Sequence, residues 1–412
     1  MFFLGAEVEF RHNEALTIGH QDSFGTLGIL TRILLTKSGM PKNLHILLAF
    51  DSFKGCLKSR KVGEHFAKGW STRRPGDQIT LLPLADGGEG TLEAFASMEG
   101  KMVSSELSIA ASGEKEVYHL NLKPGKVVLE VAQTLGIEDL NSDSPPAMER
   151  SSSHFGRQFM ARYEEGARHF MVGLGGSCTT DGGLGFLQEL GLKGIGEAGE
   201  VPLLPSRLDE VQRLEWSPMV PMNDLNIEIL SDVSNPLFGP RGACRVFGPQ
   251  KGLSEEQAHA LDREVMRIYD LLEPLLGVEV RNREGAGAAG GMGAALMTLG
   301  GNPRPGAEVL FDAIGLDKLL QKVDLVFSGE GRSDAQTVEG KGPFRLAQRA
   351  AKFRKKTILV SGAYDPKAHR ILMDTFAGVH SILSGIMPLE GAVDLGWLHL
   401  EQAGANFASL LE

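Results

Sequence analysis

The chain has 412 residues, and its 42 lysines and arginines against 52 aspartates and glutamates give a net charge of −10. This acidic balance gives no general attraction to nucleic acid or to anionic membrane surfaces, and the sequence lacks a run of about 18 or more apolar residues that would cross a bilayer. Three widely spaced cysteines, Cys56, Cys178 and Cys244, argue against a disulfide framework and a structural zinc site, so a reducing cytoplasm is the expected location.

The first 39 residues differ from the rest of the chain. They have neither the apolar core of a secretory signal nor the arginine-rich character of a transit peptide. A second methionine, Met40, stands just before the apolar segment 44–50, which is how many α/β chains begin. We therefore expect Met40 to be the natural start, with residues 1–39 either untranslated or a disordered extension. The remaining length favours two domains.

From residue 44 onward, short apolar segments alternate with longer amphipathic ones. This alternation is typical of an α/β fold with a mostly parallel sheet covered by helices. The clearest helix is 254–275, where Ser254 and Gln257 form a capping box, and a last helix is expected from about Asp394. Residues 191–224 are expected to be irregular. The expected strands are 44–50, 78–85, 126–132, 169–174, 225–233, 323–328, 356–361 and 379–384.

Five of the expected strands end in loops that combine glycine with a carboxylate or a hydroxyl group. In open α/β sheets, ligands bind beyond the carboxyl ends of the strands, where helix N-termini present free N–H groups. One such loop is equally consistent with ordinary turn chemistry, but five alike in position favour an active site that handles an anion. The loops are 51–55, 86–91, 175–183, 231–236 and 328–334.

The loop 175–183 is the most specific of the five. Its small residues let backbone N–H groups approach phosphate oxygens, and Ser177, Thr179 and Thr180 add hydroxyl donors. Asp181 supplies a carboxylate that can bind a metal ion or accept a proton from the substrate. Glycine-rich turns elsewhere present single cations at Arg241, Lys251 and Lys341, and a solvated turn explains each of them equally well.

Two familiar nucleotide-binding signatures do not fit. Residues 335–342 lack the first glycine and the hydroxyl residue of a Walker A loop. Residues 285–290 match G-x-G-x-x-G by letter, but the preceding residues 279–284 are too charged for the central strand that a dinucleotide fold requires. A dehydrogenase is therefore a remote alternative. Close packing through Gly290, Gly291 and Gly293, or a nucleotide-side loop of another fold, explains this stretch better.

Together, these motifs resemble the type I glycerate kinases over nearly the whole chain from about residue 44. Departures are few: Phe50 stands where proline is usual, Cys178 and Thr180 replace alanine and asparagine, and 152–156 is a loose version of a family segment. The matching motifs are 51–55, 85–91, 175–177, 179, 181–183, 232–237, 239–240, 247–252, 285–291, 329–332, 334, 336–337 and 340–341.

The resemblance implies phosphorylation of D-glycerate with ATP and Mg²⁺, usually at the 2-hydroxyl to give 2-phospho-D-glycerate and ADP. A glycerate 3-kinase that makes 3-phosphoglycerate and a non-catalytic relative that binds a hydroxy acid are the alternatives. The resemblance also implies a flavodoxin- or Rossmann-like domain formed by residues 40–104 and 286–412, with a second α/β domain inserted at 105–285. It leaves open whether the chain forms a homo-oligomer.

The site residues can then be given expected roles. Phosphoryl transfer depends on positioning and on neutralising the charge of the transferred group. We expect Asp181 to be the general base, and Asp51 is an alternative both for that role and for a Mg²⁺ ligand. Arg332 is favoured over a lysine for the glycerate carboxylate, because a guanidinium can bind it through two hydrogen bonds. The catalytic cations are Lys54 and Arg332; the nucleotide-binding residues are Gly175, Gly176, Ser177, Thr179, Gly329, Glu330 and Lys341; and the Mg²⁺ ligands are Asp86 and Asp232.

Overall fold

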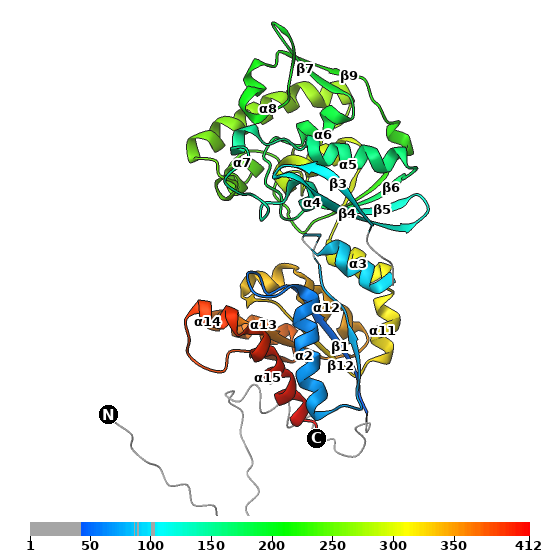
Figure 1. Cartoon of the computed structure of the whole chain (residues 1–412), viewed down its shortest axis with the longest axis vertical. Helices are drawn as coiled ribbons and strands as arrows, with labels where there is room; N and C mark the ends of the chain where they lie inside the picture. Colours follow the sequence, from blue (N-terminus) through cyan, green and yellow to red (C-terminus); the bar gives the residue numbers. More distant parts are fainter. Residues whose placement is uncertain (1–42, 86, 89, 100–103) are drawn as a thin grey trace, which may run out of the picture. The chain divides into compact units, whose positions relative to one another are not determined.

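The computed structural model describes residues 43–412, except residues 86, 89 and 100–103. The expectation for residues 1–39 therefore lies outside the described part of the chain. Two main sheets are present, and their strands are largely those expected (Figure 1), which confirms the α/β class. The first sheet has the order β16-β14-β12-β1-β2, and all of its pairs are parallel. Its strands are His45–Phe50 (β1), Gln78–Leu81 (β2), Leu325–Gly329 (β12), Thr357–Ser361 (β14) and Gly378–Ser381 (β16).

Helices cover both faces of this five-stranded sheet, which explains why β1 is apolar almost throughout. Ile46, Leu48 and Phe50 point to the face covered by α2 (Ser59–Arg73) and α15 (Gly396–Ser409). Figure 1 shows these two helices side by side. Leu47 and Ala49 point to the opposite face. That face is covered by α10 (Gly306–Ala313), α11 (Leu316–Lys322) and α12 (Gly342–Lys352).

The second sheet has six strands in the order β11-β10-β6-β5-β4-β3. The four strands from β5 to β11 are parallel, whereas β3 and β4 form an antiparallel hairpin at one edge. Its larger core contains side chains of α5 (Ser153–Glu164), α6 (Leu184–Glu189), α8 (Glu255–Leu276) and α9 (Met292–Thr298). Its strands are Ser104–Ala110 (β3), Gly113–Lys123 (β4), Lys126–Glu130 (β5), His169–Gly173 (β6), Asn226–Leu230 (β10) and Asn302–Arg304 (β11).

The structure confirms one local prediction in detail and corrects another. The α8 helix begins as expected, with the Ser254 hydroxyl accepting from the Gln257 N–H at 3.1 Å and the Gln257 side chain accepting from the Ser254 N–H at 2.9 Å. The expectation of irregular structure at 191–224 is wrong. This segment contains a three-stranded antiparallel sheet of Leu192–Gly196 (β7), Gly199–Val201 (β8) and Arg213–Trp216 (β9), whose strands are too short to show a clear period. Within the described ranges, no helix is long and apolar enough to span a bilayer.

The expected domain boundaries stay a prediction, but the sheets suggest a refinement. Strand β11 pairs with β10, and Ala286, Met292 and Leu299 belong to the core of the six-stranded sheet. We therefore propose that the inserted domain continues beyond residue 285 to about Pro305, where α10 of the other sheet begins.

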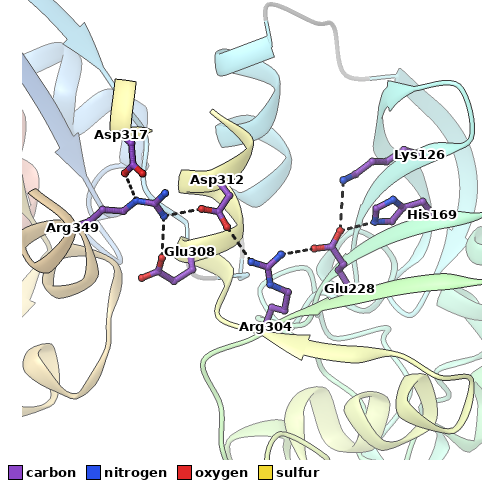
Figure 2. Close-up of polar contacts among 8 residues, drawn as sticks. All are labelled: Lys126, His169, Glu228, Arg304, Glu308, Asp312, Asp317 and Arg349. Atoms are coloured by element: carbon purple, nitrogen blue, oxygen red, sulfur yellow. Dashed lines mark hydrogen bonds and ion pairs between the residues drawn. The ribbon is translucent and has the colours of Figure 1, made fainter. Parts of the chain in front are cut away.

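An ionic network links β10 and β11 with the helices of the five-stranded sheet (Figure 2). Arg304 contacts Glu228 and Asp312, each at 3.1 Å, and Asp312 also contacts Arg349 of α12 at 2.8 Å. Burial alone would raise the pKa of Glu228, but contacts with its charged neighbours outweigh burial and hold that pKa below its ordinary value. The other members are Lys126 and His169, which contact Glu228, and Glu308 and Asp317, which contact Arg349.

Candidate active site

A cavity of about 440 Å³ lies beyond the carboxyl ends of β1, β12 and β14. It brings together five of the residues expected to act on substrate or nucleotide, although they come from loops almost 300 residues apart in the chain. One part of its lining is charged, and the other is apolar. The charged residues are Asp51, Lys54, Glu330, Arg332, Asp334 and Lys341, and the larger apolar ones are Phe53, Ile382, Leu383, Leu389 and Val393.

Strand pairing holds the loop after β1 at this cavity. The Asp51 N–H donates to the Gly329 carbonyl at 2.9 Å. Asp51 is therefore held against β12 at the point where β1 ends. A Cβ atom at Gly329 would lie 1.6 Å from the Val360 carbonyl oxygen, so only glycine fits between the two strands. This contact explains Gly329 by packing, and its expected nucleotide contact stays a prediction.

Glu330 is buried beside the cavity and holds Lys341. Its carboxylate accepts hydrogen bonds from Ser333 at 3.1 Å and Thr337 at 2.6 Å, and it forms an ion pair with the Lys341 ammonium at 2.9 Å. Glu330 is therefore well placed to orient Lys341, a cation at the start of α12. Among the residues that the structure describes, Lys54 and Arg332 form no ion pair, so the cavity has two cations available for an anionic ligand.

Leu84 and Gly87 contact the strand that ends at this cavity and the loop 175–183, respectively. The Leu84 N–H donates to the Phe50 carbonyl at 2.8 Å, and the Gly175 N–H donates to the Gly87 carbonyl at 3.0 Å. A Cβ atom at Gly175 would lie 2.2 Å from Gly88, so a glycine is required at this approach. Because the three residues from Leu84 to Gly87 span at most about 11 Å, these contacts place the loop after β6 near the loop after β1, although no described residue of 175–183 lines the cavity.

The two expected magnesium ligands have different outcomes. Asp86 lies outside the described residues. Asp232 follows β10 and lies 3.9 Å from the Arg345 guanidinium of α12, so it faces the elements that carry Lys341. The described part of the chain contains no group of three or more acidic, histidine or cysteine side chains that would hold a metal ion by itself. The magnesium role of both aspartates stays a prediction.

Asp181 does not line the cavity. It is fully buried, with one carboxylate oxygen accepting from the Ser152 N–H at 2.7 Å, the Ser152 hydroxyl at 2.6 Å and the Gly185 N–H at 3.2 Å. The other oxygen accepts from the Gly183 N–H at 3.1 Å. Burial raises the pKa of Asp181, and these hydrogen bonds oppose the rise. This geometry favours a structural role, in which Asp181 ties the loop to α5, over the general-base role that the sequence led us to expect.

The rest of the loop 175–183 is supported from inside the domain. Ser177 and Thr179 are both buried, and the Lys251 ammonium contacts the Ser177 hydroxyl and the Thr179 carbonyl. The glycine-rich stretch 285–290 lies behind the loop, since a Cβ atom at Gly290 would come within 1.9 Å of the Thr179 oxygen. Close packing, one of the two expected roles for this stretch, is therefore confirmed.

Of the two interpretations of Lys251, the solvated turn is wrong, because Lys251 is only 5% exposed. It comes from the short 3₁₀ turn Pro249–Lys251, between Gly248 and Gly252. The signal available in the sequence was the motif 247–252, which belongs to the family resemblance but does not indicate burial. The apolar cavity residues Ile382, Leu383, Leu389 and Val393 were also missed, because nothing in their pattern distinguishes a ligand-facing surface from core.

Comparison with known proteins agrees with this architecture. A family model described as the glycerate kinase family matches residues 46–412. A glycerate kinase of Bacillus subtilis (strain 168) is 31% identical over 90% of this chain and 98% of its own length, and a glycerate 2-kinase of Escherichia coli (strain K12) is 33% identical over 89% and 98%. A crystal structure from Salmonella typhimurium LT2, provisionally called glycerate kinase 2, superposes with a TM-score of 0.75 at 31% identity, covering 90% of this chain and 98% of that one. This chain is therefore an enzyme of the glycerate kinase family.

Proposed function

We propose that this enzyme transfers the γ-phosphoryl group of ATP to the 2-hydroxyl of D-glycerate, giving 2-phospho-D-glycerate and ADP. The observation that carries the proposal is the cavity that combines Lys54, Arg332 and Lys341 with the carboxylate of Asp51. The 2-position is supported by the similarity to the Escherichia coli protein, which is named a glycerate 2-kinase.

The lining of the cavity suits both substrates. Its volume is within the range of about 300–1,000 Å³ that is usual for small-molecule sites. The apolar side formed by Ile382, Leu389 and Val393 offers a surface for a nucleobase, whereas the cations suit phosphate and carboxylate oxygens. We assign Arg332 to the glycerate carboxylate, and Lys54 and Lys341 to phosphate oxygens. Asp51, rather than Asp181, is then the carboxylate best placed to accept the proton of the glycerate hydroxyl.

The oxygen donors near the cavity also suit Mg²⁺. This ion prefers oxygen ligands and is usually held in kinases by one or two protein carboxylates together with substrate phosphates, so a preformed cluster of three is not required. We keep Asp86 and Asp232 as its proposed ligands, with Asp51 as the alternative. When bound, Mg²⁺ neutralises charge on the phosphates during transfer.

Coupled assays test the proposal. The purified protein is given Mg-ATP and D-glycerate, ADP release is measured, and the product is passed to enolase with and without phosphoglycerate mutase. We expect phosphoenolpyruvate without the mutase, whereas a need for the mutase would identify a 3-kinase. Arg332→Ala should abolish most of the activity, and Arg207→Ala, which removes an exposed arginine paired with Glu210, serves as the matched control. No ADP release from folded protein would refute the kinase assignment.

A further inference from the structure

Lys251 is a buried cation beneath the loop that carries Ser177 and Thr179. Its ammonium donates to the Ser177 hydroxyl and to the Thr179 carbonyl, both at 2.8 Å. The Arg150 guanidinium donates to the Lys251 carbonyl at 2.7 Å, which fixes the backbone of the lysine. The Lys251 side chain is therefore held at both ends, with its ammonium against Ser177 and Thr179 of the loop.

The charge of Lys251 has no direct counter-charge. Across the described ranges, no carboxylate forms an ion pair with it; the titratable and charged groups nearest to it are Asp181, Arg150, Cys178 and Cys244. Burial lowers the pKa of Lys251 to about 8, so the amine is still mostly protonated at neutral pH. Burial also raises the pKa of both thiols, that of Cys244 to about 12, so neither supplies a thiolate near neutrality. A buried cation without a paired carboxylate is costly even when it is hydrogen-bonded, and an anionic ligand at the loop would offset that cost.

The direction of the Ser177 proton follows from the chemistry of the amine. A protonated lysine has three donors and no acceptor, so the Ser177 oxygen must accept from it. The Ser177 O–H is then left to donate elsewhere, and the described residues provide it with no acceptor. Beside it, the Thr179 hydroxyl is also buried without a hydrogen-bond partner in the described chain. Ser177 and Thr179 thus each have a hydroxyl proton without an acceptor in the described chain, and the Lys251 ammonium contacts both residues.

We propose that Lys251 is a positioning residue, which turns the Ser177 hydroxyl into a donor for an anionic oxygen of a substrate. The anion is a carboxylate if it belongs to glycerate and a phosphate if it belongs to ATP. This inference rests on the proposed function, because it assumes that the loop 175–183 contacts one of these two substrates.

Three variants test this role, with a fourth as the control. Lys251→Met removes the charge and the donor but keeps a similar length, and Ser177→Ala removes the hydroxyl. Each should lower kcat/KM by about 10- to 100-fold, the loss expected for one hydrogen bond to a charged group. Both changes remove the same Lys251–Ser177 hydrogen bond. The kcat/KM of the double variant should therefore be no more than about threefold below that of either single variant. Lys193→Met, at an exposed lysine paired with Glu200, should behave as wild type.

Separate readouts identify the anion and exclude a merely structural role. A rise in KM confined to D-glycerate assigns the carboxylate, and one confined to Mg-ATP assigns the phosphate. Thermal stabilisation by D-glycerate, ADP and inorganic phosphate should be present in wild type and reduced in Lys251→Met and Ser177→Ala. Because these binding shifts need no turnover, they still test the site if the chain proves not to phosphorylate glycerate.

The proposal is overturned if the losses in the double variant multiply, or if Lys251→Met lowers the melting temperature while both KM values and the ligand shifts stay unchanged. Should Lys251→Met not fold, the pH profile decides. Loss of the Lys251 proton near pH 8 should lower kcat/KM in wild type and leave Ser177→Ala flat over the same range, whereas parallel profiles would refute the coupling.

Discussion

Replacing Asp181 should affect folding more than chemistry. Its carboxylate accepts four hydrogen bonds in a fully buried position, from the Ser152 N–H and hydroxyl and from the N–H groups of Gly183 and Gly185. Asp181→Ala leaves all of these donors without their acceptor. At about 1 kcal/mol for each lost bond, and more where the donor stays unsatisfied, the free energy of unfolding should fall by at least about 4 kcal/mol.

Asp181→Asn should have a smaller effect, and the geometry explains why. The asparagine carbonyl can take the place of the oxygen that accepts three bonds, so those bonds survive without the negative charge. Its NH₂ group must then face the Gly183 N–H, and one donor loses its partner. We expect a loss of about 1–3 kcal/mol for this variant. The two replacements should therefore differ in the free energy of unfolding. A role in proton transfer alone would not produce this difference, because both replacements remove the base.

Thermal unfolding and steady-state kinetics on the same samples measure both effects. The melting temperature should fall by several degrees in Asp181→Asn and further in Asp181→Ala, while kcat per folded molecule of Asp181→Asn stays within about tenfold of wild type. The exposed Asp224→Asn is the matched control. Unchanged melting temperatures with a fall in kcat on the order of 10² or more would refute the structural role and restore Asp181 as the general base.

Four further outcomes are expected. Arg332→Lys should mainly raise the KM for D-glycerate, and an effect confined to ATP would move Arg332 to the phosphate side. Gly290→Ala should lower the free energy of unfolding by about 2 kcal/mol or more, because its Cβ would overlap a carbonyl oxygen, whereas Gly385→Ala, which has open space, should not. Glu228→Gln should lower the melting temperature at pH 7. The difference from wild type should disappear as the pH falls from about 4.5 through the pKa of Glu228 in the folded protein, which is lower, because the wild-type carboxylate is then protonated too. A chain that starts at Met40 should match the full chain in turnover and melting temperature.

Sequence patterns predicted those parts of the fold whose structure depends mainly on residues within one segment. Helix α8 has its capping box and its apolar stripe within one stretch of sequence, and the buried parallel strands are short apolar runs. The hairpin of β3 and β4 was not predicted, because its exposed and buried residues follow one another without a continuous apolar run. The small sheet in 191–224 was missed for a similar reason, since its longest strand has five residues.

The same distinction applies to the site. Asp51, Lys54 and Arg332 could be grouped because each lies in a loop that follows a strand of a parallel sheet, and the carboxyl ends of such strands share one edge. Lys341 lies on a separate glycine turn, and only the family resemblance placed it in the site. The burial of Asp181 and Lys251 could not be foreseen, because it depends on segments distant in the chain. Lys251 meets Ser177 across 74 residues. A charged residue beside glycines looks the same in sequence whether it faces water or supports a loop from within.

The glycines and the cations of this site therefore have separate tasks. At Gly87 and Gly175 the absent side chain lets the loops of two different sheets meet, and at Gly290 it lets two segments of the six-stranded sheet's domain pack closely. These glycines set the distances but supply no charge to a ligand. The positive charges that line the cavity belong to Lys54 and Arg332, which have no ion pair in the described structure, and to Lys341, which Glu330 holds in place. Substitutions in the first group should therefore act on stability and on both substrates together, whereas substitutions in the second should separate the binding of glycerate from that of ATP.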